Sequence, residues 1–408
     1  MTLRDDALKL HLENHGKLAV VSKVPIKTRE DLALAYTPGV AEPCKEIKEN
    51  KDLSFEYTCR GNMVAIVSDG TRVLGLGDIG PEAAMPVMEG KAALFKTFGD
   101  VDAVPICIDT KDPAKIIETV RFLQPSFAGI NLEDISSPKC YDIECELKKI
   151  CDIPVFHDDQ HGTAIACLAA VIGALRFVKK DMKTAKFVVN GCGAAGSAIG
   201  RLLISMGAEN VTMVDRFGAL YEGIDANLDR IQSYLATVTN KEHKKGTLAD
   251  IAKGVDVLLG VSAPNVFTKE IIASMADKAI VFALANPVPE TSYADAIEAG
   301  AAVAGTGRSD SPNQVNNVTV FPGVFRGAID VRAKAITEEM KVAAVYAISE
   351  LIDEKDLRAD YVVPDAFDPR VAPAVAAAVA RVAMETGIAR IKVDPEEVRA
   401  NTMKRVGR

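Results

Sequence analysis

Two separated stretches of the chain carry acidic residues of the kind that bind a divalent cation. Glu133 and Asp134 lie within residues 131–135, and Asp159 lies within residues 156–163. Carboxylates gathered in one pocket repel one another unless a positive charge lies among them, and all-oxygen ligands suit Mg²⁺ or Mn²⁺. We therefore predict a metal site formed by Glu133, Asp134 and Asp159.

A glycine-rich motif further along the chain predicts a dinucleotide site. It directly follows the apolar run Phe187–Val189, opens a helical stretch, and is followed by another strand. In dinucleotide-binding folds the first glycine permits the turn, the second lets the backbone approach the pyrophosphate, and the third lets the helix pack on the strand. The motif alone is weak, but this context favours a cofactor over a plain glycine turn. The predicted cofactor-binding residues are Gly191, Cys192, Gly193, Ala194, Ala195, Gly196 and Asp215.

Asp215 bears on which nicotinamide cofactor is used. It lies 19 residues beyond Gly196, where a carboxylate accepts hydrogen bonds from the adenosine ribose and repels a 2′-phosphate. Arg216 beside it could instead hold such a phosphate. We therefore expect NAD, with NADP as the open alternative.

The bulk composition indicates a large protein that acts on small molecules. A chain of 408 residues that is 48% hydrophobic is too long for one core, so two domains are expected. The net charge of −8, from 48 basic and 56 acidic residues without long blocks, disfavours nucleic acid or an anionic membrane as partner. Acidic residues near the start disfavour a signal peptide, and no segment is expected to span a bilayer, so we predict a soluble cytoplasmic protein.

Eight cysteines are scattered along the sequence without a C-x-x-C pair. Most have apolar neighbours, which predicts reduced and buried thiols. Disulfides and a cysteine zinc site are therefore not expected.

Apolar runs divide the chain into two α/β units. Up to about residue 155, runs such as Val64–Val67 and Ala103–Ile108 are typical of strands that alternate with helices. Thr163–Leu175 is apolar almost all round, which predicts a buried helix between the units, and Val371–Ala383 predicts a helix that begins near Pro373. The strands predicted for the second unit are Lys186–Asn190, Val211–Val214, Val255–Val261, Ala279–Ala283 and Ala302–Ala304.

This pattern predicts an α/β fold. An N-terminal α/β substrate or catalytic domain is expected over residues 1–160, followed by a Rossmann-like doubly wound parallel-sheet NAD-binding domain over residues 161–385. Residues 386–408 are expected to form a C-terminal helical tail. Ligands of such sheets lie beyond the carboxyl ends of the strands.

Seven short motifs occur in the order of one known family: Tyr36–Ala41, Asp69–Asp78, Glu89–Lys96, Glu133–Asp134, Phe156–Ala164, Ala285–Pro287 and Asn316–Gly323. Together they resemble the malic enzymes, specifically the short bacterial and archaeal type of decarboxylating malate dehydrogenase. The resemblance extends to the segment Ala359–Pro364. It implies oxidative decarboxylation of L-malate to pyruvate and CO₂, with reduction of NAD or NADP and dependence on Mg²⁺ or Mn²⁺. It also implies a homodimer or higher homo-oligomer, in which active-site residues are shared between subunits in some short members.

The resemblance assigns Lys91 as the general base and Asp158 as the residue that orients it. A free lysine with a pKa of about 10.4 is a poor base at neutral pH, and a near-neutral pKa would need roughly 4 kcal/mol of bias against the ammonium form. We expect burial and the metal to supply that bias. The alternatives are a solvated lysine, as assumed for Lys96, and a helix N-cap role for Asp158.

The remaining site residues also follow from the resemblance. Tyr36 matches the general acid that protonates C3 of enolpyruvate. Without the resemblance, it would be interpreted as a tyrosine packed at a turn. Whether Tyr36 acts within its own chain is open. Arg72 is expected to grip a malate carboxylate through a forked pair of hydrogen bonds. Asn286 and Asn317 are expected to contact substrate, and Asn286 also the cofactor. Either could be a turn residue, and Asn316 could replace Asn317.

The sequence also allows four other interpretations. His157 and His161 are spaced for zinc, but the groups clustered with them are carboxylates, so packing or hydrogen bonding is favoured. A malolactic conversion of malate to lactate uses similar catalytic groups. A noncatalytic NAD-binding protein and a plain malate dehydrogenase that forms oxaloacetate are less favoured. The acyltransferase-like domain of the longer family members is not expected.

Overall fold

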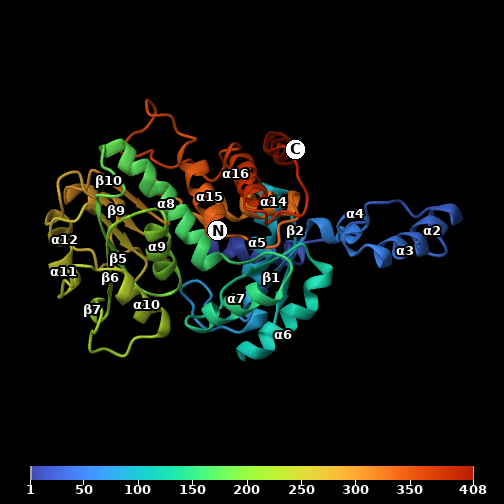
Figure 1. Ribbon diagram of the computed structural model, residues 1–408, viewed down its shortest axis with the longest axis horizontal. Coiled ribbons are helices and arrows are strands. Elements are labelled where there is room, and N and C mark those ends of the chain that lie inside the picture. Colours follow the sequence, from blue (N-terminus) through green and yellow to red (C-terminus); the bar gives the residue numbers. More distant parts are fainter. Residues whose placement is uncertain (1, 408) are drawn as a thin grey trace.

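Two β-sheets, each covered by helices, make up the body of the protein (Figure 1). The computed structural model describes residues 2–407. We call the part built on the four-stranded sheet the first lobe and the part built on the six-stranded sheet the second lobe. The predicted α/β fold with a Rossmann-like second unit is confirmed.

The sheet of the first lobe has the strand order β2-β1-β3-β4, and every pair is parallel. The order reverses between β1 and β3, so a crevice opens at the carboxyl ends of these strands. The acidic pair at 133–134 directly follows β3. The elements of this lobe are η2 (Cys59–Asn62), β1 (Met63–Ser68), α5 (Pro81–Gly99), β2 (Asp102–Cys107), α6 (Pro113–Leu123), η3 (Gln124–Ser126), β3 (Gly129–Leu132), α7 (Lys139–Ile150) and β4 (Val155–His157).

Helix α8 (Asp158–Val178) joins the two lobes. It begins at Asp158, five residues before the predicted start at Thr163, and it runs through Gly162 without a break. Among residues 2–407 it is the one helix long and apolar enough to cross a membrane, although none was expected, and 83% of its most apolar window is buried inside the protein. It packs against helices on both sides as a core element.

The sheet of the second lobe has the order β10-β9-β8-β5-β6-β7, in which only β7 is antiparallel. Counted from β7, the strand order matches that of a doubly wound dinucleotide-binding sheet, and the direction in which successive strands are added reverses between β5 and β8. The elements are β5 (Lys186–Asn190), α9 (Ala194–Ser205), β6 (Asn210–Asp215), β7 (Gly218–Ala219), α10 (Arg230–Val238), α11 (Leu248–Ile251), β8 (Val257–Gly260), α12 (Lys269–Ala273), β9 (Ile280–Ala283), α13 (Tyr293–Glu298) and β10 (Val303–Thr306).

The C-terminal part of the chain returns to the first lobe. Phe321 and Phe325 pack on Phe95 of α5, with ring centroids 4.5 and 5.3 Å apart. The segment expected as a tail contains a helix, α17, which packs against α16 and α5. The elements are η4 (Asn317–Thr319), α14 (Phe321–Asp330), α15 (Glu338–Ser349), α16 (Val371–Glu385) and α17 (Pro395–Val406).

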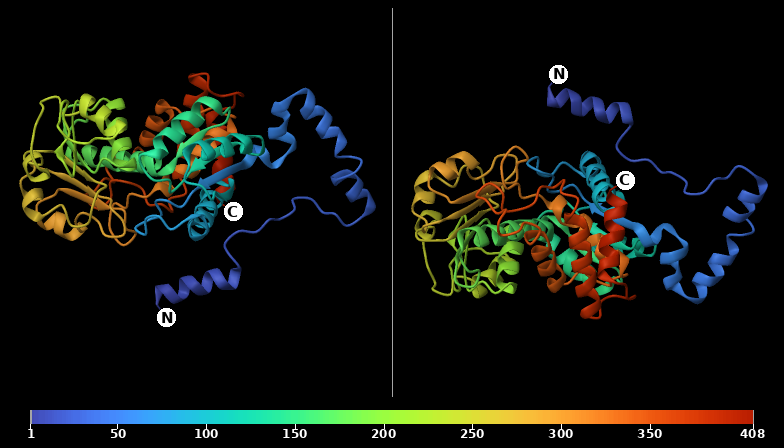
Figure 2. Two further views of the ribbon diagram at one scale, coloured as in Figure 1. Left: turned by 90° about the horizontal axis from the view of Figure 1, so that it is seen from below. Right: turned by 90° about the horizontal axis from the view of Figure 1, so that it is seen from above.

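Most of residues 2–57, which we call the N-terminal arm, extends away from both lobes (Figure 2), although Lys17 Nζ donates to Pro86 O on α5 at 2.8 Å. No residue of the arm's helices is buried, and Leu3, Val20 and Leu34 are among its exposed apolar side chains. Large apolar surfaces of this kind normally mark an interaction site. Its elements are α1 (Leu3–Asn14), α2 (Arg29–Ala35), α3 (Ala41–Glu49), η1 (Lys51–Leu53) and α4 (Ser54–Tyr57).

All eight cysteines are free thiols. The expectation that most are buried is met only in part, because four are buried, Cys107 is half-buried, and Cys44, Cys59 and Cys145 are exposed. Burial raises the pKa of the Cys167 and Cys140 thiols to about 12, which makes them poor nucleophiles.

Candidate active site

The three acids singled out by the sequence meet at the carboxyl ends of β3 and β4. One carboxylate oxygen each from Glu133, Asp134 and Asp159 lies within 4.8 Å of the other two. Asp134 has a left-handed backbone with φ of 54°, and its amide donates to Asp159 Oδ2 at 2.9 Å. A non-glycine residue held in this region is strained, which is common where a side chain must be aimed at a ligand.

The electrostatics of this cluster fit a divalent cation. Burial and the neighbouring acids raise the pKa of Asp134 to about 9. Burial raises the pKa of Glu133 to about 8, with Lys91 opposing the shift, and that of Asp159 to about 6. Asp134 Oδ2 is buried and has no hydrogen-bond partner among residues 2–407. An all-oxygen set with an unsatisfied buried acceptor is the donor chemistry that Mg²⁺ or Mn²⁺ prefers.

Lys91 lies beside the acid cluster on α5. Its Nζ lies 2.9 Å from Glu133 Oε1, bonds to Asp158 Oδ2, and sits 4.2 Å from the centre of the Phe321 ring. The side chain is only 11% exposed, so it is not a solvated lysine. Burial lowers the pKa of Lys91, but the carboxylates of Asp158 and Glu133 outweigh burial, and the pKa is raised. The expected fall of the lysine pKa is therefore wrong for the protein's own residues, because two acids contact the ammonium group.

Asp158 is held in place by several groups. It is the first residue of α8, where His157 takes the N-cap position, so the alternative of an Asp158 N-cap is wrong. Its Oδ2 accepts a hydrogen bond from Asn317 Nδ2 at 2.9 Å, and Thr163 Oγ1 donates to Asn317 Oδ1 at 3.2 Å. The carboxylate folds back over Gly162, where a Cβ would lie 2.7 Å from Asp158 Cγ and closer still to Oδ1. Only glycine at this helical position leaves room for it.

Arg72 lies on the loop after β1, next to the acid cluster. Its amide donates to Asp134 O at 2.9 Å, and its side chain is exposed. The loop is braced by the buried Asp69, which binds Lys139 and accepts from Thr71 Oγ1 at 2.7 Å. The Arg72 side chain is therefore free to reach a ligand from a fixed backbone.

Asn286 approaches the same loop from the second lobe. A Cβ on Gly75 would lie 2.7 Å from Pro287 Cδ, and a Cβ on Gly307 would lie 3.0 Å from Asn286 Nδ2. The approach of Gly75 to Pro287 brings the loop of Arg72 and the loop of Asn286 together between the lobes. Asn316 instead turns its side chain to its own backbone, where it accepts from Val318 N at 3.0 Å.

Tyr36 is not brought to this site by its own chain. It lies at the end of α2 on the N-terminal arm, and its side chain is 66% exposed. Figure 1 places α2 at the far end of the arm, remote from α5 and α8. The candidate general acid is thus separated from Lys91 within one protomer.

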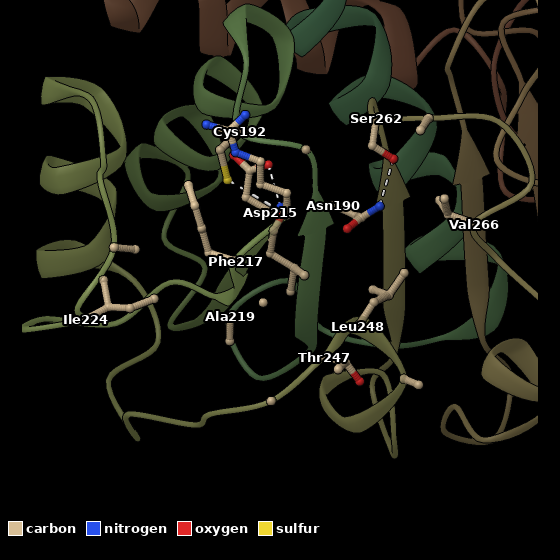
Figure 3. A pocket seen from close by; sticks show the side chains of 18 of the residues that line it. Asn190, Cys192, Asp215, Phe217, Ala219, Ile224, Thr247, Leu248, Ser262 and Val266 are labelled. Atoms are coloured by element: carbon tan, nitrogen blue, oxygen red, sulfur yellow. Dashed lines mark hydrogen bonds between the residues drawn. The ribbon is translucent and has the colours of Figure 1, made fainter.

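The glycine-rich motif borders a cavity of about 1140 Å³ at the carboxyl ends of β5, β6 and β8 (Figure 3). Gly191 has φ of 106°, and a Cβ on Gly196 would lie 2.9 Å from the carbonyl carbon of Gly191. Gly193 has nothing within 4 Å of a Cβ position, so the space before α9 stays open. This cavity size suits a cofactor. Gly191, Cys192, Gly193 and Asp215 line it, whereas Ala194, Ala195 and Gly196 begin α9 behind it.

Asp215 is fixed at the end of β6. Its Oδ1 accepts from Arg216 N at 2.7 Å, and its Oδ2 accepts from Gln232 Nε2 at 2.7 Å. The Arg216 guanidinium lies 4.8 Å from the centre of the Phe217 ring. Both Asp215 and Arg216 line the cavity, so both groups weighed for cofactor choice are in position.

The two histidines lie in a buried network and not in a nitrogen metal site. Among residues 2–407 the only cluster of three candidate metal ligands is the carboxylate one. His161 Nε2 lies 2.7 Å from Glu144 Oε1, and Glu144 also accepts from the amide of His157. Glu144, Gly162 and Phe321 were not singled out by sequence reasoning. Gly162 lies inside the motif Phe156–Ala164, and Phe321 lies inside the motif Asn316–Gly323. None of the seven motifs includes Glu144.

The fold and site define an α/β oxidoreductase with a Rossmann-like nicotinamide-binding domain. The malic enzyme N-terminal domain profile matches residues 15–148, and the malic enzyme NAD-binding domain profile matches residues 160–384. The chain belongs to the malic enzyme family.

Similar proteins include named malic enzymes and solved malic enzyme structures. The chain is 57% identical to the bifunctional malic/malolactic enzyme of Bacillus subtilis (strain 168), over 99% of this chain and 98% of that protein. It is 51% identical to the NAD-dependent malic enzyme of Geobacillus stearothermophilus, over 92% of this chain and 78% of that protein. It matches the malic enzyme structure of Pyrococcus horikoshii with a TM-score of 0.96 and 45% identity, over 100% and 96% of the two chains.

Proposed function

We propose that the protein converts L-malate to pyruvate and CO₂ while reducing NAD, with a divalent cation held by Glu133, Asp134 and Asp159. The observation that carries this proposal is the position of Lys91. It lies against Glu133 of the acid cluster, and Asp158, which it also contacts, is bound by Asn317 of η4. A bound Mg²⁺ or Mn²⁺ would supply Lewis-acid stabilisation of developing oxyanion charge.

Lys91 acts as the general base. Oxidation at C2 of malate requires that the hydroxyl proton leave as hydride passes to the nicotinamide ring, and the Nζ atom must be neutral to accept that proton. The acids that hold the lysine charged are Glu133 and Asp158. Because Glu133 is also a proposed metal ligand, cation binding would neutralise part of its charge and remove one cause of the high lysine pKa.

Arg72, Asn286 and Asn317 position the substrate. Arg72 offers a planar fork of donors that matches a carboxylate, and it projects from a loop braced against Asp134. Asn286 approaches from the opposite lobe and offers an uncharged amide to substrate or nicotinamide. Asn317 donates to Asp158, so its closest observed role is to hold the residue that orients Lys91.

We propose a homodimer in which Tyr36 enters the site of the partner subunit as the general acid. Tyr36 is exposed on an arm that extends away from its own site, and the same arm exposes Leu3, Val20 and Leu34. Two identical arms exchanged about a two-fold axis would bury these side chains and complete both sites. Tyr36 would then return a proton to C3 of enolpyruvate after CO₂ leaves.

We expect NAD as the preferred cofactor because Asp215 is held as a fixed acceptor at the adenosine end of the cavity. NADP remains the alternative through Arg216, and relatives of both kinds exist, such as the NADP-dependent malic enzyme of Escherichia coli (strain K12), 46% identical, of whose length this chain spans 53%. The free thiols agree with a cytoplasmic location.

A second candidate function is the conversion of malate to lactate. It is favoured by the 57% identical relative from Bacillus subtilis, whose name includes both malic and malolactic activity. The same base, acid and cation set would serve, with the hydride returned from the cofactor to pyruvate. Absorbance at 340 nm separates the two reactions, because only the malic reaction accumulates NADH.

The experiment that tests the proposal is steady-state kinetics with L-malate, with NAD or NADP and with or without Mn²⁺. Wild-type protein should release pyruvate and CO₂ only with both cofactor and metal. Lys91→Ala and Asp159→Asn should each lose roughly 10²-fold or more in kcat. Retention of activity by both variants would contradict the mechanism.

A further inference from the structure

A buried carboxylate in the second lobe has no part in the chemistry proposed above. Glu290 lies in the loop between β9 and α13 and is 0% exposed. Its Oε1 accepts from the amide and the hydroxyl of Ser262 at 2.6 and 3.1 Å, and its Oε2 accepts from the amide of Ala285 at 3.0 Å. Both oxygens are therefore bound to loops at the carboxyl edge of the sheet.

One of these loops borders the cofactor cavity, and the other leads directly to Asn286. Ser262 follows β8 and lines the cavity, where Asn190 at the end of β5 donates to its hydroxyl at 2.7 Å (Figure 3). Ala285 directly precedes Asn286, which approaches the loop of Arg72 from across the cleft. One carboxylate thus connects the ends of β5, β8 and β9 through a single chain of hydrogen bonds.

The surrounding residues are adapted to this carboxylate. A Cβ on Gly260 would lie 2.5 Å from Glu290 Cδ, so a side chain there would displace it. Burial of a charge is unfavourable unless several donors satisfy it, and an apolar residue often serves packing equally well. The three donors that bind Glu290 all come from the two loops that border the site. This pattern indicates a role in positioning these loops.

We propose that Glu290 is a positioning residue that sets the distance between Ser262 and Asn286, and so couples cofactor binding to substrate binding. The inference rests on the proposed function, because it assumes that NAD occupies the cavity and that Asn286 faces the substrate. Glu290 does not line the cavity and acts through the loops on either side of it.

Glu290→Gln tests this proposal. The amide side chain keeps one acceptor but turns a donor towards either Ser262 N or Ala285 N, so one of the two loops must move. We expect the NADH dissociation constant, measured by NADH fluorescence on the intact protein without turnover, to rise roughly tenfold. The KM for malate should rise as well, whereas Mn²⁺ binding measured by electron paramagnetic resonance should stay within twofold, because the acid cluster belongs to the other lobe.

The matched control is Glu298→Gln, an exposed acid on α13 that pairs with Lys269 at 2.8 Å, and it should leave NADH binding within twofold of wild type. A double-mutant cycle with Ser262→Ala separates positioning from a general loss of stability. If Glu290 acts through Ser262, Ser262→Ala should weaken NADH binding much less in the Glu290→Gln background than in wild type. If Glu290→Gln does not fold, the Ser262→Ala variant alone provides the test, and it should weaken NADH binding severalfold.

Additive effects on NADH binding, or a Glu290→Gln protein that binds NADH within twofold of wild type, would overturn the assignment. Absence of NADH and NADPH binding to the wild-type protein would instead refute the proposed function, and the inference with it. NADH binding by the wild type with no turnover of malate would contradict the proposed reaction alone and leave the loop-positioning result standing.

Discussion

Gly162→Ala should lower kcat/KM for malate about 10²-fold through one added methyl group. Gly162 lies one helical turn after Asp158 on α8, and a Cβ there would lie 2.7 Å from Asp158 Cγ and closer to Oδ1. The carboxylate must therefore rotate away from Lys91 and Asn317, to which it is bound. At an unconstrained position inside a helix, the same change from glycine to alanine stabilises the helix by about 1 kcal/mol.

The magnitude follows from the contacts that are lost. Each hydrogen bond to a charged group contributes about 1.5–3 kcal/mol, so the two bonds of Asp158 outweigh the helix-propensity gain of about 1 kcal/mol. The melting temperature should fall. A misplacement of about 1 Å in a group that orients a catalytic base is enough for a loss of about 10²-fold, and we expect kcat/KM for malate to fall by that factor.

The assay compares kcat/KM and thermal unfolding of Gly162→Ala with those of Gly90→Ala. Gly90 also lies inside a helix, α5, but nothing lies within 4 Å of its Cβ position. Gly90→Ala should raise the melting temperature slightly and leave kcat/KM within twofold. Wild-type activity in Gly162→Ala would refute the reasoning that Asp158 must remain against Lys91.

Three further predictions concern the metal, the cofactor and the assembly. Because burial raises the pKa of Glu133 to about 8 and of Asp134 to about 9, these two carboxyls bind protons more tightly in the folded metal-free protein than in the unfolded chain. These two carboxyls should therefore destabilise the metal-free fold increasingly as pH rises from about 5 to 9, and the rise in melting temperature caused by Mn²⁺ should grow over the same range, as differential scanning calorimetry would detect. Asp215→Ala should weaken NADH binding roughly tenfold and leave NADPH binding equal or tighter, a change that fluorescence titration measures. Mixed and refolded Tyr36→Ala and Lys91→Ala protomers should regain activity, because one of the two sites in a heterodimer is then intact; if the mixture stays inactive, Tyr36 acts within its own chain.

Part of the candidate site could be predicted from sequence because it depends on local order. Glu133 and Asp134 follow a short apolar strand, and Asp158 and Asp159 follow the next one. Parallel strands place their carboxyl ends at one edge, so acids in these positions must converge. The glycine spacing at 191–196 likewise requires a tight turn between strand and helix.

Other features could not be predicted because they depend on contacts between distant segments. The start of α8 at Asp158 differs from the predicted start at Thr163. Only the structure shows that the Asp158 carboxylate occupies the place where a Cβ of residue 162 would lie, so that glycine is required inside the helix. Burial without the metal does not lower the pKa of Lys91, because the contacts of Asp158 and Glu133 with the ammonium group outweigh burial.

The sequence by itself determined the α/β class, the order of the two units, the clustering of the three acids and the position of the cofactor motif, because strand alternation and turn glycines act over a few residues. Only the tertiary structure decided that Lys91 lies between Glu133 and Phe321, that Tyr36 stands away from its own site, and that Glu290 joins two loops. These depend on how segments more than 20 residues apart pack against or away from one another, which no local pattern encodes.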